Sequence, residues 1–226
     1  MKNSPQKKSK KILVIDVGGT NLKIHATGAG PTVKVPSGLT MTAAQMVAAV
    51  KKVAAKWQFD VVSIGYPGPV VNGRPTREPH NLGGGWVKFD FPKAFGRPVK
   101  IINDAAMQAL GGHRGGRSLF LGLGTGLGSA LVIDKTVLPL ELAHLPYKKG
   151  RTYEEYLGTT GFENSGKKKW AKHVVEVVGL LKNALLADYV VLGGGNARLL
   201  KTLPPNVELG KNENAIIGGG RLWDAP

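Results

Sequence analysis

The sequence predicts an α/β protein of two related lobes with a cleft between them. One observation is the order of elements: strand, glycine-rich turn, strand, helix and strand follow one another before about residue 105, and the pattern then starts again. A second observation is that three apolar strands each run directly into a glycine-rich turn. The length of 226 residues and the hydrophobic fraction of 42% suffice for buried cores in both lobes.

In the first half, short β-branched runs alternate with segments of helical periodicity. We expect strands at residues 11–18, 23–27, 32–35, 61–66 and 99–102. We expect helices at 42–57, with Thr42 as the N-cap, and at 105–110, with Gly111 and Gly112 ending the helix. The segment between Pro67 and Phe91 is rich in Gly, Asn and Pro and is interpreted as a loop.

In the second half, the same reasoning predicts strands at 118–122, 129–133 and 188–192 and helices at 167–186 and 214–223. The resulting organisation is a basic flexible tail (1–10), an N-terminal lobe (11–105) and a C-terminal lobe (106–213). The terminal segment 214–226 could join the N-terminal lobe.

Composition excludes several classes of protein. The chain has no cysteine, which rules out disulfide scaffolds, thiolate zinc sites and cysteine nucleophiles. No apolar run reaches the roughly 18–20 residues that span a bilayer, and the polar, basic start does not read as a secretory signal. We therefore expect a soluble cytoplasmic protein without a membrane partner.

The charge is strongly positive, with 31 Lys+Arg against 15 Asp+Glu and a formal net charge of +16. Five of the basic residues lie in the first eleven positions. Such a surface favours polyanions, namely nucleic acid, an acidic membrane face or a phosphate-rich substrate. A surface that is basic without a specific polyanionic partner is the alternative.

The first glycine-rich turn follows a strand that delivers a carboxylate. Its candidate anion-binding residues are Asp16, Gly18, Gly19, Thr20, Asn21 and Lys23. Two glycines let the backbone approach an anion, and successive N–H groups in such a turn form an anion-binding nest. A hairpin turn that merely needs glycine is the structural alternative.

The second and third turns comprise Gly124, Thr125 and Gly126, and Gly193, Gly194 and Gly195. The second does not match dinucleotide G-x-G-x-x-G spacing and opens into a strand, so we interpret it as another phosphate turn. The segment 161–168 has the spacing of a P-loop, but Lys168 occupies the position where Ser or Thr must bind magnesium. We interpret that segment as a loop before the long helix.

The chain resembles the ROK sugar kinases of the actin/hexokinase/Hsp70 superfamily from about Ile12 to Trp223, and among them the polyphosphate glucokinases. The three glycine turns resemble the family's two phosphate motifs and its adenosine or donor-end motif. Four further segments resemble its catalytic-base motif and its sugar-contacting motifs: Ile102-Asn103-Asp104-Ala105, Asn81-Leu82-Gly83, Glu141-Leu142-Ala143-His144 and Glu154 within Tyr153–Tyr156.

The resemblance implies a two-lobed, actin-like (ribonuclease H-like) fold and a hexokinase reaction. Asp104 would be the catalytic base, because a carboxylate can accept the proton of a sugar hydroxyl as the bond to phosphorus forms. Asp16 would hold Mg²⁺, through water. The sugar contacts would be Asn81, Asn103, Asp104, Glu141, His144 and Glu154. The implied substrates are glucose or a related hexose and, as donor, ATP or inorganic polyphosphate; we also expect a homodimer.

The sequence departs from the family in three places. Ala143 replaces the glycine of the Glu-x-Gly-His motif, and residues 147–151 stand where most bacterial members hold zinc with cysteines, so we predict no zinc. The first phosphate motif begins at Asp16, so we expect no N-terminal helix-turn-helix. Aromatic residues make up 7% of the chain and form no stripe with basic residues that could stack bases, so we expect no specific nucleic acid partner. A non-catalytic sugar-binding ROK protein and a basic nucleic-acid-binding protein are the alternative functions, and an N-cap is the alternative role for Asp104.

Overall fold

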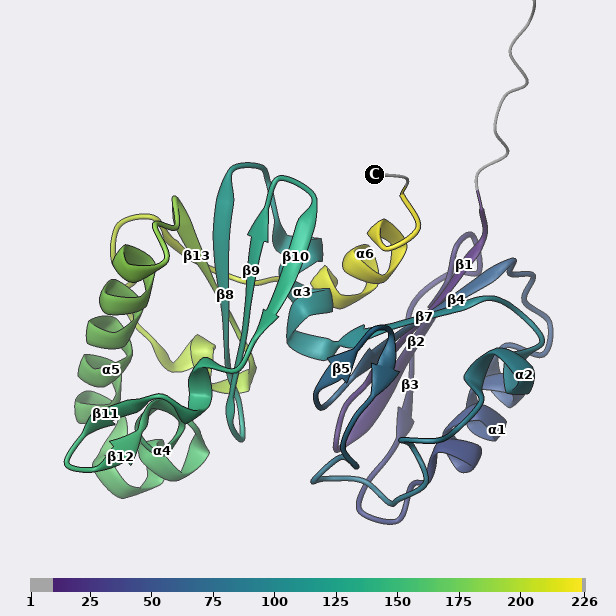
Figure 1. The fold of residues 1–226 in the computed structure, drawn as a ribbon, viewed down its shortest axis with the longest axis horizontal. Helices are drawn as coiled ribbons and strands as arrows, with labels where there is room; N and C mark the ends of the chain where they lie inside the picture. The colour runs from purple at the N-terminus through teal and green to yellow at the C-terminus, as the bar shows by residue number, and fades with distance from the viewer. Residues whose placement is uncertain (1–9, 225–226) are drawn as a thin grey trace, which may run out of the picture. The chain divides into compact units, whose positions relative to one another are not determined.

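The computed structural model describes residues 10–224, and within them the chain forms two compact units (Figure 1). The first unit runs to Ile102 and also contains the terminal segment from Leu222, and the second spans Asn103–Arg221. Apart from Lys10, the expected basic tail lies outside the described residues.

The first unit is built on a five-stranded sheet of order β3-β2-β1-β4-β7. Its strands are β1 (Ile12–Val17), β2 (Asn21–Ala26), β3 (Val33–Pro36), β4 (Val61–Tyr66) and β7 (Val99–Asn103). β1 pairs antiparallel with β2 and parallel with β4. The β-branched runs of β1 and β4 are buried on both faces, as central strands of a covered sheet require.

Two helices, α1 (Ala43–Val53) and α2 (Phe91–Phe95), contribute apolar side chains to the core of this sheet. Thr42 caps α1 as predicted, because its hydroxyl accepts from the N–H of Gln45 while the Gln45 side chain accepts from the N–H of Thr42. Trp86 is fully buried, and its indole N–H donates to the carbonyl of Gly83 at 2.7 Å.

The segment expected to be a loop contains a short hairpin, β5 (Val70–Val71) and β6 (Arg74–Pro75). Asn72 and Gly73 form its turn with φ of 50° and 71°, the left-handed conformation that two-residue hairpins need. The Asn-Gly pair was therefore the sequence signal for this hairpin.

The second unit has its own five-stranded sheet, of order β10-β9-β8-β13-β14. Its strands are β8 (Arg117–Leu123), β9 (Leu127–Ile133), β10 (Thr136–Leu140), β13 (Tyr189–Gly193) and β14 (Val207–Leu209). The long helix α5 (Thr159–Ala184) covers one face, where Trp170, Val174 and Val177 are buried. The helices α3 (Asp104–Gly112) and α6 (Asn214–Arg221) lie on the other side of the sheet (Figure 1).

Gly111 and Gly112 are the last two residues of α3, so the helix ends at the glycines that the sequence indicated. Their small size serves the packing of α3 on α6. A Cβ on Gly111 would overlap the backbone of Asn214, and a Cβ on Gly218 would overlap the carbonyl of Met107. α6 thus packs in the second unit, and only the residues after it group with the first.

The region before the long helix is helical as well, which corrects the loop interpretation of residues 161–168. α5 already begins at Thr159 and is broken at Gly166, whose φ of 71° and ψ of 159° are not helical. The regular helix resumes at Lys167, the expected start. No strand leads into this segment, since the short helix α4 (Tyr153–Leu157) precedes it. The rejection of a P-loop follows from this context.

A small hairpin, β11 (Pro146–Lys148) and β12 (Arg151–Thr152), precedes α4. Two 3₁₀ helices complete the unit, η1 (Leu142–His144) and η2 (Gly195–Leu199). Within residues 10–224, no helix combines the length and apolar character needed to traverse a membrane.

Candidate active site

The first glycine turn joins β1 to β2 and is held in shape by its own backbone. The N–H of Gly18 donates to the carbonyl of Asn21 at 3.1 Å, and a Cβ on Gly18 would lie 2.9 Å from that same oxygen. Ser37 fixes the turn from β3's end by donating its hydroxyl to the Gly18 carbonyl at 2.6 Å. The glycine is required here because the chain folds back on itself too closely for a side chain.

Asp16 stands on β1 directly opposite Lys23 on β2. The Asp16 side chain is buried, and its Oδ2 accepts from the Lys23 ammonium at 2.7 Å. A single carboxylate of this kind suits the proposed water-mediated hold on Mg²⁺, since Mg²⁺ keeps several waters and takes few protein ligands. Among the described residues no group of three or more His, Asp or Glu side chains could hold a metal directly.

Asn81 lies against this turn. A Cβ on Gly19 would come within 2.9 Å of the Asn81 Cβ, so the first phosphate turn and the candidate sugar-contacting asparagine are neighbours in the first unit. The loop carrying Asn81 is anchored behind it, because the N–H of Gly83 donates to the carbonyl of Met41 at 3.0 Å. Sequence positions 19 and 81 are therefore brought together by folding.

The second glycine turn joins β8 to β9 and contacts Glu154. The N–H of Gly124 donates to the carbonyl of Gly126 at 3.1 Å, which closes the turn. The N–H of Leu127 donates to Glu154 Oε2 at 3.2 Å, and a Cβ on Gly126 would overlap that oxygen. Glu154 thus lies directly against the backbone of the turn, an arrangement that only glycine at 126 permits.

The third glycine turn packs on the second. Gly194 has φ of 80°, and a Cβ there would overlap the backbone of Leu123. The Gly124 carbonyl accepts hydrogen bonds from the N–H and from the hydroxyl of Thr159, both at 3.1 Å. The Asn196 amide donates to the Thr159 hydroxyl at 3.3 Å. One threonine at the start of α5 therefore joins the two turns.

Asp104 begins α3, beside the second turn. Asn103 is the N-cap, since its Oδ1 accepts from the N–H of Ala106 at 3.1 Å. The Asp104 Oδ1 accepts from the N–H of Ala105 at 2.7 Å. A Cβ on Gly128, just after the second turn, would lie 2.9 Å from the Ala105 Cβ. The helix start carrying Asp104 is thus packed next to the strand that leaves Gly124–Gly126, and Asn103, not Asp104, is the N-cap.

Glu141 and His144 lie at the ends of η1 and are exposed, with 3.8 Å between Glu141 Oε2 and His144 Nε2. Ala143 between them is buried, so the alanine that replaces the family's glycine is accommodated by packing. In the sequence, Glu141 and His144 come before the β11–β12 hairpin and Glu154 comes after it.

The β11–β12 hairpin is fastened to α5 by an aromatic cluster. The Tyr147 hydroxyl lies 3.1 Å from His173 Nδ1, and Tyr156 packs edge-on against the same imidazole. Burial lowers the pKa of His173 and raises the pKa of Tyr147. Lys148 forms an ion pair with Glu176 at 2.6 Å, and this contact lowers the pKa of the Glu176 carboxyl.

A sequence model of the ROK family matches residues 10–139, which is more than half of the chain. The chain belongs to the ROK family. A polyphosphate glucokinase from Mycobacterium tuberculosis is 29% identical over 92% of this chain and 89% of its own length. The predicted resemblance to ROK sugar kinases is confirmed.

Solved ROK structures share the fold. A polyphosphate/ATP-glucomannokinase from Arthrobacter sp. strain KM superposes with a TM-score of 0.74 and 22% identity, covering 93% of this chain and 97% of that one. A ROK glucokinase from Streptomyces griseus, solved with glucose and AMPPNP, gives a TM-score of 0.69 and 18% identity over 94% and 98% of the two chains. The predicted two-lobed, actin-like α/β fold is confirmed.

Within this ROK chain the expected residues fall into two groups, one in each unit. Asp16, Gly18, Gly19, Thr20, Asn21, Lys23 and Asn81 belong to the first unit. The second unit holds Asn103, Asp104, Gly124, Thr125, Gly126, Glu141, His144, Glu154, Gly193, Gly194 and Gly195.

Sequence reasoning missed the role of Thr159 as the joint between two glycine turns. It follows Gly158, and a Cβ on that glycine would come within 2.7 Å of the Thr125 carbonyl. A Gly-Thr pair ahead of the predicted long helix was the available signal, and nothing in the linear sequence indicated its distant partners.

Proposed function

We propose that this protein is a hexose kinase that transfers a phosphoryl group from inorganic polyphosphate or ATP to the 6-hydroxyl of glucose. One observation carries the proposal. In the second unit, the start of α3 with Asp104 and the side chain of Glu154 both lie against the β8–β9 segment that carries the second glycine turn. Phosphoryl transfer to an alcohol requires a carboxylate that accepts a proton and, close to it, backbone N–H groups that bind the phosphoryl group.

In this mechanism Asp104 accepts the proton of the sugar hydroxyl as that oxygen attacks phosphorus. Asn103 caps α3 and so holds the neighbouring carboxylate at the helix start. Asn81, Asn103, Glu141, His144 and Glu154 supply the donors and acceptors that a polyhydroxyl ring needs. The backbone N–H groups of the first and second glycine turns bind the transferring phosphoryl group.

Asp16 is the residue we assign to Mg²⁺. When bound, Mg²⁺ neutralises phosphate charge during the transfer. Lys23, paired with Asp16 at 2.7 Å, holds the carboxylate in place and adds a positive charge beside the same turn. The glycines at positions 193–195 form the donor end, held against the second turn by Thr159 and Asn196.

We infer that basic residues of the second unit form a track that binds polyphosphate as the donor. Its residues are Lys148, Lys149, Arg151, Lys167, Lys168, Lys169, Lys172, Arg198 and Lys201. Lysines of α5 line two hollows of about 380 and 660 Å³, and Lys201 lines the larger one. Lys148 contributes less than the others, because Glu176 already neutralises it. A long polyanion can contact many such cations at once, whereas a single nucleotide needs few.

The test is an assay of glucose phosphorylation with ATP and with polyphosphate, run side by side on the same preparation. Glucose-dependent transfer from either donor is expected. Sugar binding without transfer from either donor would favour a non-catalytic ROK protein, and salt-sensitive DNA binding without transfer would favour the nucleic-acid alternative. Cytoplasmic localisation, a homodimeric state and the absence of zinc stay predictions from the sequence.

A further inference from the structure

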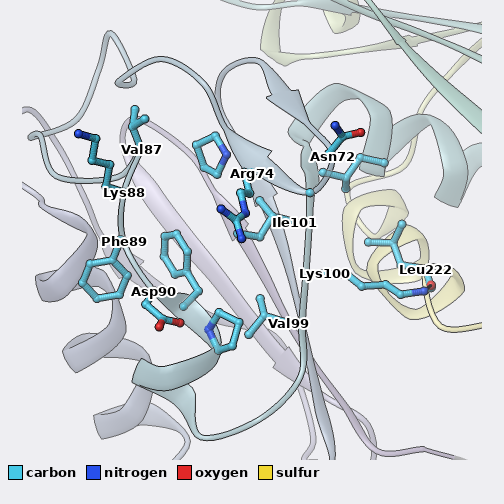
Figure 2. A pocket seen from close by; sticks show the side chains of 15 residues that line it. Asn72, Arg74, Val87, Lys88, Phe89, Asp90, Val99, Lys100, Ile101 and Leu222 are labelled. Atoms are coloured by element: carbon cyan, nitrogen blue, oxygen red, sulfur yellow. Dashed lines mark hydrogen bonds between the residues drawn. The ribbon is translucent and has the colours of Figure 1, made fainter.

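The first unit contains a hollow of about 690 Å³ that none of the candidate active-site residues lines (Figure 2). It lies between the β5–β6 hairpin, the segment leading into α2 and the strand β7. Its size falls within the range of ligand-binding clefts, roughly 300–1,000 Å³.

The hollow follows the edge of the sheet. β7 is the last strand in the order β3-β2-β1-β4-β7, so within the described chain it has a single neighbour, β4. Four consecutive residues, 99–102, line the hollow, although successive side chains point to opposite faces of a strand. Both faces can border one hollow only along the edge between them.

The backbone of β7 presents hydrogen-bonding groups to this hollow. The carbonyl of Pro98 accepts from the N–H of Val62 on β4 at 2.9 Å. Because successive residues of a strand direct their backbone polar groups to opposite sides, those of Val99 and Ile101 face away from β4. An open edge of this kind is a template for one more strand.

The walls are apolar and the polar groups are mainly cationic. Phe89, Val99 and Ile101 provide apolar surface, and Arg74 points into the hollow while Lys88 stands at its rim (Figure 2). Neither cation forms a salt bridge to any residue in the range 10–224. Asp90, the acidic residue of the lining, already accepts from the N–H of Lys93 at 3.0 Å as the N-cap of α2.

The geometry points to this edge as a docking groove for an extended peptide segment of a partner protein, with acidic side chains alternating with apolar ones. The peptide would add to the sheet beside β7, its backbone bonding to Val99 and Ile101 and its acidic side chains meeting Arg74 and Lys88. The groove is independent of the proposed phosphoryl transfer, since it shares no residue with that site.

A second copy of the chain fits this groove poorly. A two-fold interface through β7 would bring two copies of Arg74 and Lys88 into one interface, and the four positive charges would repel one another. The chain also offers only 15 acidic residues against 31 basic ones. An acidic partner complements the groove, and a basic copy of itself does not.

The experiment titrates the full chain with a fluorescent six-residue peptide of alternating Glu and Val and follows fluorescence anisotropy. We expect saturable binding, protection of the Val99 and Ile101 amides from hydrogen exchange, and loss of binding when the peptide backbone is N-methylated. The double variant Arg74→Glu/Lys88→Glu should weaken binding by about ten-fold, because two attractions become repulsions.

The matched control is Lys51→Glu/Lys52→Glu, which changes the net charge equally on α1, outside the lining of the hollow. Three results would overturn the proposed docking groove, since each shows charge attraction without strand addition. They are equal weakening by the control variant, equal binding of an all-Glu peptide, and equal binding of the N-methylated peptide. Absence of saturable binding would overturn it too. Sedimentation of the chain as a dimer that β7 variants dissociate would assign the edge to a second copy instead.

Discussion

Asp104 begins α3 while its neighbour Asn103 caps the helix, so replacing Asp104 removes a carboxylate and leaves the cap intact. We expect Asp104→Asn to lower kcat by roughly 10²–10⁴-fold with little change in glucose KM, because the variant loses the proposed general base. Steady-state kinetics of the folded variant provides the measurement. A kcat near that of the wild type would remove Asp104 from the base position.

Glu154 is proposed to bind a sugar hydroxyl, and its Oε2 also accepts from the N–H of Leu127 at 3.2 Å. The amide of Glu154→Gln can still accept from that N–H, so the glycine turn should persist while the charged contact to the sugar is lost. We expect the glucose KM of Glu154→Gln to rise by about ten-fold. His144→Ala should raise it as well, and an unchanged KM in both variants would exclude these residues from the sugar site.

At the scale of elements, the contact between α3 and α6 depends on glycine. A methyl group at position 111 would overlap the backbone of Asn214, whereas a methyl group at Gly220 on α6 meets nothing within 4 Å. We expect Gly111→Ala to lower the free energy of unfolding by about 1–3 kcal/mol. Gly220→Ala, the control, should be neutral or slightly stabilising, because alanine favours helix. Equal denaturant midpoints for the two variants would contradict this packing.

The hairpin β11–β12 should hold α5 less firmly in acid. Burial lowers the pKa of His173, with Lys148 and Lys169 acting in the same direction and Glu176 against them. The unfolded chain therefore binds more protons as the pH falls below about 6.5, and stability declines there. His173→Gln, which does not titrate, should show a shallower fall in melting temperature between pH 7.5 and 5.5. His113 adds the same loss of stability in acid to the wild type and to the variant, because burial lowers the pKa of His113 too. Parallel curves would contradict the assignment.

Elements with a strong local signal were predictable from the sequence, and contacts between distant segments were not. The capping residue Thr42 and the strands β1, β4 and β8 follow from local composition and periodicity. The need for glycine at position 111 comes from the backbone of Asn214, about a hundred residues away, and the contact of Glu154 with Leu127 depends on how α4 folds back. Tertiary packing overrides local propensity at such positions.

At the scale of the whole molecule, the effect of the net positive charge should be visible in which phosphoryl donor the protein prefers. If the lysines of α5 bind polyphosphate, the KM for polyphosphate should rise steeply with salt and fall with chain length, since each phosphate contact releases counterions. Lys167, Lys168 and Lys169 together replaced by Ala should impair the polyphosphate reaction selectively. Lys51, Lys52 and Lys56 replaced by Ala provide the control of equal charge in the first unit. An equal loss of the ATP reaction and the polyphosphate reaction would contradict binding of polyphosphate to the basic track.

The most direct test of the central claim measures glucose 6-phosphate formed from glucose by the wild-type chain and by Asp104→Asn, with ATP and polyphosphate supplied in parallel. The account predicts glucose-dependent product from the wild type with at least one donor and a loss of roughly 10²–10⁴-fold in the variant. No product from the wild type with either donor, or equal product from both proteins, would contradict it.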